Sequence, residues 1–221
     1  MIKIEKTVLP SPEQWEIIIE GMRNPMNSWD KSDSHKTHIE DAETLETADY
    51  EFFLGENDHK LMTGLAKGGA VHAKYRRMIP VFLTINAPLY WWKEFDTYKV
   101  GTVANSCSTM HKIHTKKFDL VDFSHEHLDD YASLPILEQT IKVLNVHRQA
   151  FLESNSKSDW WQMIQLLPTS YNQKRTVMLN YEVMVNIYHS RKNHKLDEWH
   201  TFCDWIKKLP YSELITGEYD D

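Results

Sequence analysis

Residues 79–113 read IPVFLTINAPLYWWKEFDTYKVGTVANSCSTMHKI, and this stretch carries the strongest indications of both a fold and a binding site. Apolar and more polar residues alternate from Val81 to Ile85, which predicts a strand with one apolar face. The aromatic and charged segment 89–98 follows an Ala-Pro turn and predicts an amphipathic helix. Small polar residues then fill 100–110. This order predicts a strand that leads into a helix and then into a polar loop where a ligand could bind.

Two parts of this stretch allow both a structural and a functional interpretation. Leu89, Trp92 and Phe95 have the spacing of a core stripe, although aromatic rings also stack on a flavin or a base. The small residues of 100–110 permit close approach of a ligand to the backbone and offer hydroxyl donors. The same residues are also common in ordinary tight packing.

The overall composition is that of a folded protein. The chain has 221 residues, of which 41% are hydrophobic and 12% aromatic, so it can bury a core. No segment has the composition of a linker, and we expect one domain over residues 1–221. The net charge of −7 argues against general nucleic-acid binding, although it allows a local cationic pocket for a phosphate.

The cysteines and the N-terminus indicate a cellular compartment. Cys107 and Cys203 form no disulfide framework, which suits a reducing environment. Residues 1–10 lack the apolar core of a signal peptide, and no apolar run has the length of a membrane span. We therefore expect a soluble, cytoplasmic protein. Cys203 falls on an apolar helix face, which predicts a buried structural thiol.

Periodicity predicts the remaining secondary structure. The chain should begin with a short strand over residues 2–8. Ser11 can cap a helix in which Pro12 takes the first position and Gln14 completes a capping box. That helix should end before Asn24-Pro25. Further helices are expected over Asp58–Lys67, Leu134–Glu153, Trp160–Leu167, Thr176–Arg191 and Leu196–Leu209. The chain is therefore expected to be α+β and rich in helix.

The polar segment 23–42 has two interpretations. It can be a solvated surface loop, since it contains few apolar anchors. It can also be an ordered loop over a pocket, with polar contacts from Arg23, Asn24, Asn27 or Ser28.

Histidines and basic residues are candidates for metal or anion ligands. His111, His114, His125 and His127 lack a third ligand at zinc-site spacing, so no metal site is expected. His72 precedes a basic cluster of Lys74, Arg76 and Arg77. A lone histidine in such a position can be a packed or surface residue as well as a catalytic one.

Several of these features resemble the flavin-dependent thymidylate synthases, also called thymidylate synthase complementing proteins. That family has a strand ending in Ala-Pro, an Arg-Gln pair, the motif RHRxxSxNExSxRY, a later Leu-Pro, and a polar helix with asparagines and an arginine. The matching positions here are FLTINAP at 82–88, Lys93-Glu94, Thr97–Met110, Leu167-Pro168, Asn180, Asn186 and Arg191, with His72 at the position of a flavin-proximal histidine.

The chain departs from the motif where the family carries cations. The Arg-His-Arg of the motif becomes Thr97-Tyr98-Lys99, and its final Arg-Tyr becomes Thr109-Met110. Ile164 stands where the family has another nucleotide-binding arginine. Within the motif, Ser becomes Thr102, Asn-Glu becomes Ala104-Asn105 and the later Ser becomes Cys107. Losing these arginines removes charge-assisted bonds to phosphate, which suits a ligand with less phosphate charge.

The resemblance implies a function and a set of contacts. It implies a helix-rich domain with a small antiparallel sheet, in which reduced FAD, NADPH and methylenetetrahydrofolate serve the reductive methylation of dUMP, a pyrimidine nucleotide, in a homotetramer. Its implied cofactor contacts are His72, Tyr98, Lys99, Thr102, Asn180, Asn186 and Arg191. Its implied substrate contacts are Lys93, Glu94, Asn105, Cys107, Ser108 and Thr109.

Two other readings are compatible with the same residues. The chain can be a catalytically inactive relative that keeps the fold and binds a nucleotide or a protein partner. It can also be an unrelated α+β domain in which the motif positions coincide by chance.

Overall fold

The computed structural model describes residues 1–38 and 50–219. The chain divides into two compact units, which are described separately below. Unit 1 comprises Met1–Lys6, Leu83–Lys99 and Ala104–Val177, and unit 2 comprises Thr7–Phe82, Val100–Val103 and Met178–Asp221. The expected single domain over 1–221 stays a prediction.

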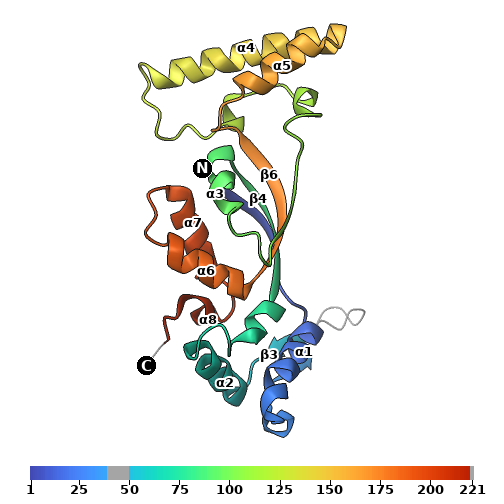
Figure 1. Cartoon of the computed structure of the whole chain (residues 1–221), viewed down its shortest axis with the longest axis vertical. Helices are drawn as coiled ribbons and strands as arrows, with labels where there is room; N and C mark the ends of the chain where they lie inside the picture. The colour runs from blue at the N-terminus through green and yellow to red at the C-terminus, as the bar shows by residue number, and fades with distance from the viewer. Residues whose placement is uncertain (39–49, 220–221) are drawn as a thin grey trace. The chain divides into compact units, whose positions relative to one another are not determined.

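The main sheet is small and antiparallel, with the strand order β1-β4-β6-β5 (Figure 1). Its strands are β1 (Lys3–Val8), β4 (Pro80–Pro88), β6 (Asn172–Asn180) and β5 (Val103–Ser106). In β4 the side chains of Val81, Leu83 and Ile85 are buried, as the alternation predicted. Together with the many helices, this sheet confirms the α+β, helix-rich class.

The sequence predicted a polar loop over residues 100–110. The structure corrects this, because the segment contains the strand β5. All four residues of β5 are exposed, so no alternation of apolar and polar residues signals the strand. The strand exists because its backbone pairs with β6. One residue beyond it, the Cys107 amide still donates to the Lys174 carbonyl at 2.9 Å.

Unit 1 contains α3 (Leu89–Phe95), η4 (Ile113–Thr115), η5 (Leu120–Asp122), α4 (Ser133–Ser154) and α5 (Lys157–Leu166). Figure 1 shows α4 and α5 side by side. They enclose a core whose buried members are Ile113, Phe118, Phe123, Leu137, Ile141, Leu144 and Met163. The helix predicted at 134–153 is confirmed. The second helix begins three residues earlier than predicted, because Ser156 caps it by accepting from the Ser158 amide at 3.2 Å.

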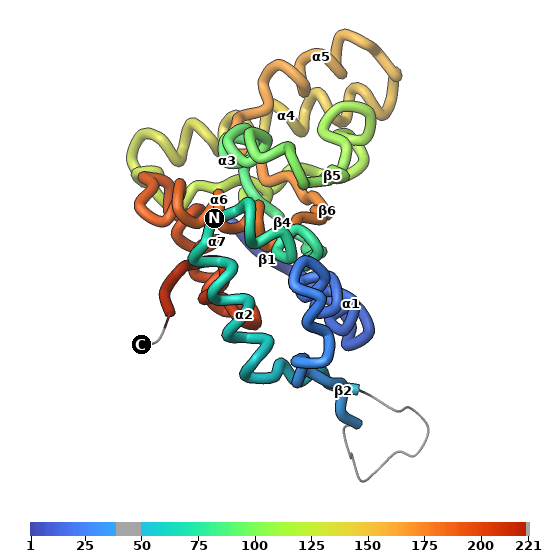
Figure 2. The backbone as a smooth tube through the Cα atoms, turned by 60° about the horizontal axis from the view of Figure 1, so that its bottom comes forward, coloured from blue at the N-terminus to red at the C-terminus, as the bar shows by residue number. Residues whose placement is uncertain are grey.

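Unit 2 contains four longer helices: α1 (Pro12–Arg23), α2 (Glu56–Lys67), α6 (Tyr181–Arg191) and α7 (Asp197–Ile206). Its shorter elements are η1 (Asn24–Met26), η2 (Trp29–Lys31), β2 (His35–His38), β3 (Tyr50–Phe53), η3 (Lys74–Met78) and α8 (Glu213–Thr216). Figure 2 shows the course of α1, β2 and α2. The capping box of α1 is confirmed, because Ser11 and Gln14 each accept from the other's backbone amide.

The helix predicted over Thr176–Arg191 is wrong in its first five residues, which belong to β6. Val177, Tyr181, Met184 and Tyr188 are all buried and do have helical spacing, which explains the error. The chain nevertheless extends to Asn180, where the side chain accepts from the Val183 amide at 3.1 Å and starts α6. The strand ends and the helix begins without an intervening loop.

The segment 23–38 is ordered by one buried carboxylate. Asp58, which is fully buried, accepts from the Nε of Arg23 at 2.5 Å and from the hydroxyls of Ser32 and Ser34 at 2.8 and 2.7 Å. Burial alone would raise the pKa of Asp58, but the hydrogen bonds from Ser34, Ser32 and Arg23 outweigh it and hold that pKa below its usual value. This segment is therefore tied to α2, and residues 39–42 of the predicted loop lie outside the described residues.

Within residues 1–38 and 50–219, no helix combines the length and apolarity needed to cross a bilayer.

Candidate functional site

The residues that the family motif singles out lie in both units, so each group is described within its own unit. Unit 1 carries the predicted substrate contacts together with Tyr98 and Lys99. Unit 2 carries His72, Thr102, Asn180, Asn186 and Arg191.

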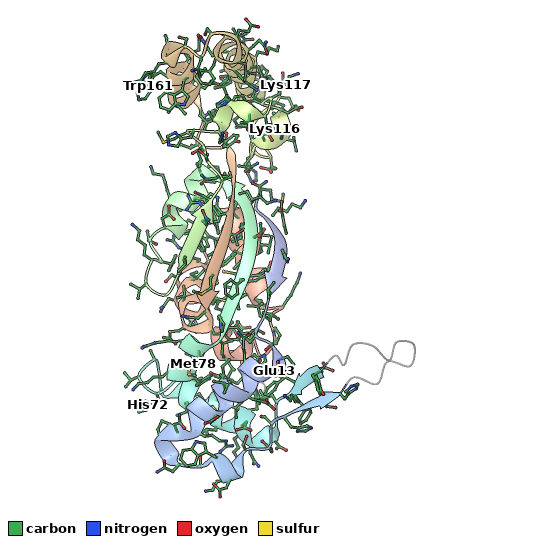
Figure 3. All side chains as sticks on the ribbon, turned by 90° about the vertical axis from the view of Figure 1, so that its right-hand side faces the viewer. Glu13, His72, Met78, Lys116, Lys117 and Trp161 are labelled. Atoms are coloured by element: carbon green, nitrogen blue, oxygen red, sulfur yellow. The ribbon has the colours of Figure 1, made fainter. Side chains whose placement is uncertain are left out.

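Two of the predicted substrate contacts in unit 1, Cys107 and Ser108, line a cavity of about 210 Å³. Three lysines line the same cavity: Lys112, Lys116 and Lys117. Figure 3 labels Lys116 and Lys117, which lie near each other in the upper part of the view. A small cavity with several ammonium groups and a hydroxyl is suited to a phosphate or another compact anion.

Ser108 shapes one side of this cavity. Its hydroxyl oxygen accepts from the backbone amides of His111 at 2.9 Å and of Met110 and Lys112 at 3.3 Å each. These bonds curl the chain back on itself, because three successive amides point at one oxygen. Lys112 is thereby brought to the same cavity as Ser108.

The other walls of the cavity contain one carboxylate and one phenol. Lys116 pairs with Asp122 at 2.6 Å, so one lysine is neutralised and two remain to give a net positive cavity. Burial raises the pKa of Tyr171 to about 12, so its hydroxyl is a neutral donor near pH 7.

The backbone of Cys107 is fixed by hydrogen bonds, whereas the residue itself is exposed. Its carbonyl accepts from the side-chain amide of Gln173 at 2.9 Å. Gln173 in turn accepts from the Nε of Arg175 at 2.9 Å, and the guanidinium lies 4.3 Å above the ring of Trp92. Arg175 also pairs with Asp96 at 2.7 Å, so this arginine supports the strand rather than the cavity.

The other predicted residues of unit 1 do not line this cavity. Lys93 and Glu94 lie on α3, and Tyr98 and Lys99 follow its end. Asn105 lies in the exposed strand β5, and Thr109 lies in the turn that Ser108 organises. Their roles stay predictions.

In unit 2 the structure brings the turn at Gly101 against the start of α6. Gly101 has φ +80°, and a Cβ there would approach Cγ2 of Val183 to 3.0 Å and Nδ2 of Asn180 to 3.3 Å. Only glycine adopts this backbone without strain and leaves room for those neighbours. The next hydroxyl, of Thr102, is buried and makes no hydrogen bond within the described residues.

Unit 2 also contains a pair of buried charges, Arg76 on η3 and Glu182 in the first turn of α6. Nη1 of Arg76 lies 3.7 Å from Oε2 of Glu182, and both side chains are largely buried. That distance is too long for a hydrogen bond, and neither Nε of Arg76 nor Oε2 of Glu182 has a hydrogen-bond partner in the described part of the chain. Buried polar atoms of this kind are rare in a folded protein and are expected to be satisfied by a ligand or water.

The remaining predicted cofactor contacts are distributed over the surface of unit 2. His72 is exposed in the turn after α2, as Figure 3 shows, and Asn186 is exposed on α6. The guanidinium of Arg191 lies 4.9 Å above the ring of Trp199.

Sequence reasoning missed two groups that the structure brings forward. Lys112, Lys116 and Lys117 were outside the family motif, and the adjacent pair of lysines was the available signal. Arg76 was noted as part of a basic cluster, but its partner Glu182 lies far along the chain, on α6. Among the described residues no group of three metal-binding side chains lies together.

Comparison with known proteins identifies the fold. No protein-family model and no curated protein sequence matches the chain. A structure of thymidylate synthase X from Helicobacter pylori with FAD and dUMP is similar over 98% of this chain and 96% of that chain, with a TM-score of 0.63 and 14% identity. A second structure of that protein, also with FAD and dUMP, has a TM-score of 0.61 and 14% identity, covering 98% and 97%.

A third similar structure is the UMP/dUMP methylase PolB from Streptomyces cacaoi, bound with 5-Br dUMP. Its TM-score is 0.61 at 13% identity, covering 98% of this chain and 94% of that chain. The chain therefore has the fold of the flavin-dependent thymidylate synthases, and the resemblance in the sequence is confirmed at the level of the fold.

Proposed function

We propose that this chain is a thymidylate synthase-like protein that binds a pyrimidine nucleotide and FAD. The observation that carries the proposal is the cationic cavity of unit 1, which adjoins the motif position where the family holds the nucleotide phosphate. Lys112 and Lys117, the two lysines of the cavity that are not paired with Asp122, would replace the phosphate-binding arginines that the motif lacks. The similar structures from Helicobacter pylori contain both FAD and dUMP, which supports the choice of ligands.

The proposed nucleotide site assigns a role to each group of the cavity. The lysines would neutralise the phosphate, and the Cys107–Ser108 backbone, fixed by Ser108 and Gln173, would hold the turn in place. Because lysine is a point charge rather than a bidentate fork, we expect weaker geometric selection of the phosphate than arginine gives.

The proposed flavin site uses the groups of unit 2. The hydroxyl of Thr102 and the unsatisfied atoms of Arg76 and Glu182 offer both a donor and an acceptor, which fits the polar edge of a flavin ring. When bound, FAD would supply the hydride for methylating dUMP with methylenetetrahydrofolate, after reduction by NADPH. We also propose that the chain is cytoplasmic and forms the homotetramer that the resemblance implies.

The nucleotide site is tested by comparing dUMP with deoxyuridine in isothermal titration calorimetry. We expect Lys112→Ala/Lys117→Ala to weaken dUMP binding at least about tenfold, because a charge-assisted hydrogen bond contributes roughly 1.5–3 kcal/mol. Deoxyuridine, which has no phosphate, should bind equally well to both proteins. Lys157→Ala/Lys208→Ala removes the same charge from residues that do not line the cavity and serves as the control. Equal dUMP affinities for the two double variants would contradict the nucleotide site.

The flavin site is tested by the absorbance spectrum after incubation with FAD and gel filtration. We expect a flavin band near equimolar amounts in the wild type and a clearly smaller one in Thr102→Val, which removes the hydroxyl and keeps the shape. A colourless wild-type protein would contradict the flavin part of the proposal. Retained FAD and dUMP without turnover would instead indicate an inactive relative.

A further inference from the structure

A second cavity, of about 510 Å³, lies in unit 2 between α1 and the ordered segment 28–34. It contains none of the residues assigned above to nucleotide or flavin. Its volume is in the range of sites for small molecules, which are commonly apolar with a few placed polar groups. The side chains that define its chemistry are Glu16, Ile19, Glu20, Arg23, Trp29 and Phe52.

The only cationic side chain among those lining the cavity is already neutralised. Arg23 is 3% exposed and pairs with Asp58 through Nε at 2.5 Å. Its Nη1 and Nη2 donate to the carbonyls of Ser28 at 3.1 Å and of Lys31 at 3.0 Å. A guanidinium engaged in this way cannot turn to an incoming anion, so the cavity presents no free positive charge from Arg23.

Two aromatic rings of the cavity are held in place. Phe52 stacks on the buried ring of Trp15, with centroids 5.5 Å apart and planes 11° apart. The indole N–H of Trp29 donates to Oδ1 of Asn24 at 2.8 Å, which fixes the orientation of the ring while half of the side chain stays exposed. The faces of such rings attract cations, and the attraction is strongest for tryptophan.

Two carboxylates complete the lining. Glu16 and Glu20 are four residues apart on α1 and therefore lie on one face of that helix. An ammonium group already approaches one of them, since Nζ of Lys36 lies 3.6 Å from Oε2 of Glu16. Glu20 makes no ion pair or hydrogen bond through its side chain within the residues that the structure describes.

We propose that this cavity binds a small organic cation, of the class in which an ammonium or quaternary ammonium group is attached to a short apolar body. Glu20 supplies the opposite charge, because Glu16 already lies close to the ammonium group of Lys36. The rings of Trp29 and Phe52 supply cation–π contact and shape, and Ile19 supplies an apolar wall. A ligand of this class is distinct in charge from the nucleotide and the flavin.

The proposal is tested with choline and with its neutral analogue 3,3-dimethyl-1-butanol, which has the same shape. Titration of the full-length protein is followed by the indole N–H resonance of Trp29 in ¹H–¹⁵N spectra. We expect choline to shift this resonance in a saturable way and to bind at least about tenfold more tightly than the neutral alcohol. Equal affinities would show that charge is not recognised and would overturn the proposal.

Variants assign the effect to the cavity. Glu20→Gln keeps the size of the side chain and should weaken choline binding at least about threefold, without changing the affinity for the alcohol. Glu153→Gln removes one exposed charge from α4 in unit 1 and should leave choline binding unchanged. Trp29→Leu should reduce the preference for choline over the alcohol, with binding then followed by calorimetry. Wild-type choline affinity in both Glu20→Gln and Trp29→Leu would also overturn the proposal.

Discussion

Two buried arginines in unit 2, Arg23 and Arg76, differ in how completely the surrounding chain satisfies them. Arg23 donates to Asp58, to Ser28 and to the Lys31 carbonyl. Arg76 pairs with Glu182 at 3.7 Å and interacts electrostatically with the Tyr75 hydroxyl, but its Nε has no hydrogen-bond partner within the described part of the chain. Both are almost fully buried, at 3% and 6% exposure, so burial alone does not distinguish them.

The difference separates a structural charge from a candidate functional one. A buried charge costs several kcal/mol of desolvation unless close hydrogen bonds offset it. The contacts of Arg23 offset that cost and order the segment 28–34. Those of Arg76 leave polar atoms unsatisfied on both partners, which is the pattern expected where a ligand completes the site.

Removing the acceptor of Arg23 should have the largest effect. Asp58→Asn leaves an uncompensated guanidinium buried and weakens the hydrogen bonds to the 32–34 segment. We expect a loss of about 3–5 kcal/mol in the free energy of unfolding, measured by urea denaturation. Asp130→Asn, at an exposed position, should change stability by less than about 0.5 kcal/mol. A similarly small loss in Asp58→Asn would show that Arg23 is not structural.

The same carboxylate should make stability depend on pH. Its pKa is lower in the folded protein than in the unfolded chain, so the folded state binds this proton less readily. The stabilisation is therefore present above about pH 4 and is lost as the pH falls through the folded-state pKa. Denaturation curves between about pH 2 and pH 6 should show this loss in the wild type. The slope should be smaller in Asp58→Asn, and an unchanged slope would contradict the assignment.

Replacing the second pair should cost little stability and more function. Arg76→Met/Glu182→Leu removes both buried charges and fills their space, so we expect a change in unfolding free energy within about 1 kcal/mol. FAD retention after gel filtration should fall clearly in the same variant. Loss of several kcal/mol with unchanged FAD retention would reverse the comparison and make Arg76 the structural residue.

The smallest expected effect is on the reactivity of the two thiols, one of which is buried and the other exposed. Cys203 is buried in unit 2, and burial raises its pKa to about 11, so it carries almost no thiolate at pH 8. Cys107 is exposed in unit 1. Titration of the native protein with a colorimetric disulfide reagent should show one reacting thiol, and Cys107→Ser should abolish it. Two rapidly reacting thiols would show that Cys203 is accessible.

The elements that the sequence predicted well are those encoded by neighbouring residues. Ser11, Pro12 and Gln14 give α1 its beginning, and the apolar face from Trp15 to Met22 is buried as the periodicity requires. The motif residues Cys107 and Ser108 line a cavity, and their role in binding a nucleotide stays a prediction.

The elements that were missed depend on distant partners. The stripe through Val177 and Tyr181 suits a helix, and only pairing with other strands makes residues 172–180 extended. The exposed strand β5 has no apolar pattern to detect. Asp58 lies 35 residues beyond Arg23, so their contact depends on how α1 and α2 fold together. The spacing of residues along the sequence does not show which distant residues come into contact in the folded chain.

The direct junction between β6 and α6 restricts how this part of the chain can vary. Asn180 is at once the last residue of the strand and the cap of the helix. Inserting a single residue after it would turn the whole of α6 by about 100° relative to the strand, because an α-helix has about 3.6 residues per turn. Buried Tyr181 and Tyr188 would then leave their places together. We therefore expect homologues to have no insertions or deletions at this junction. Insertions and deletions should occur instead in the loops that connect other elements.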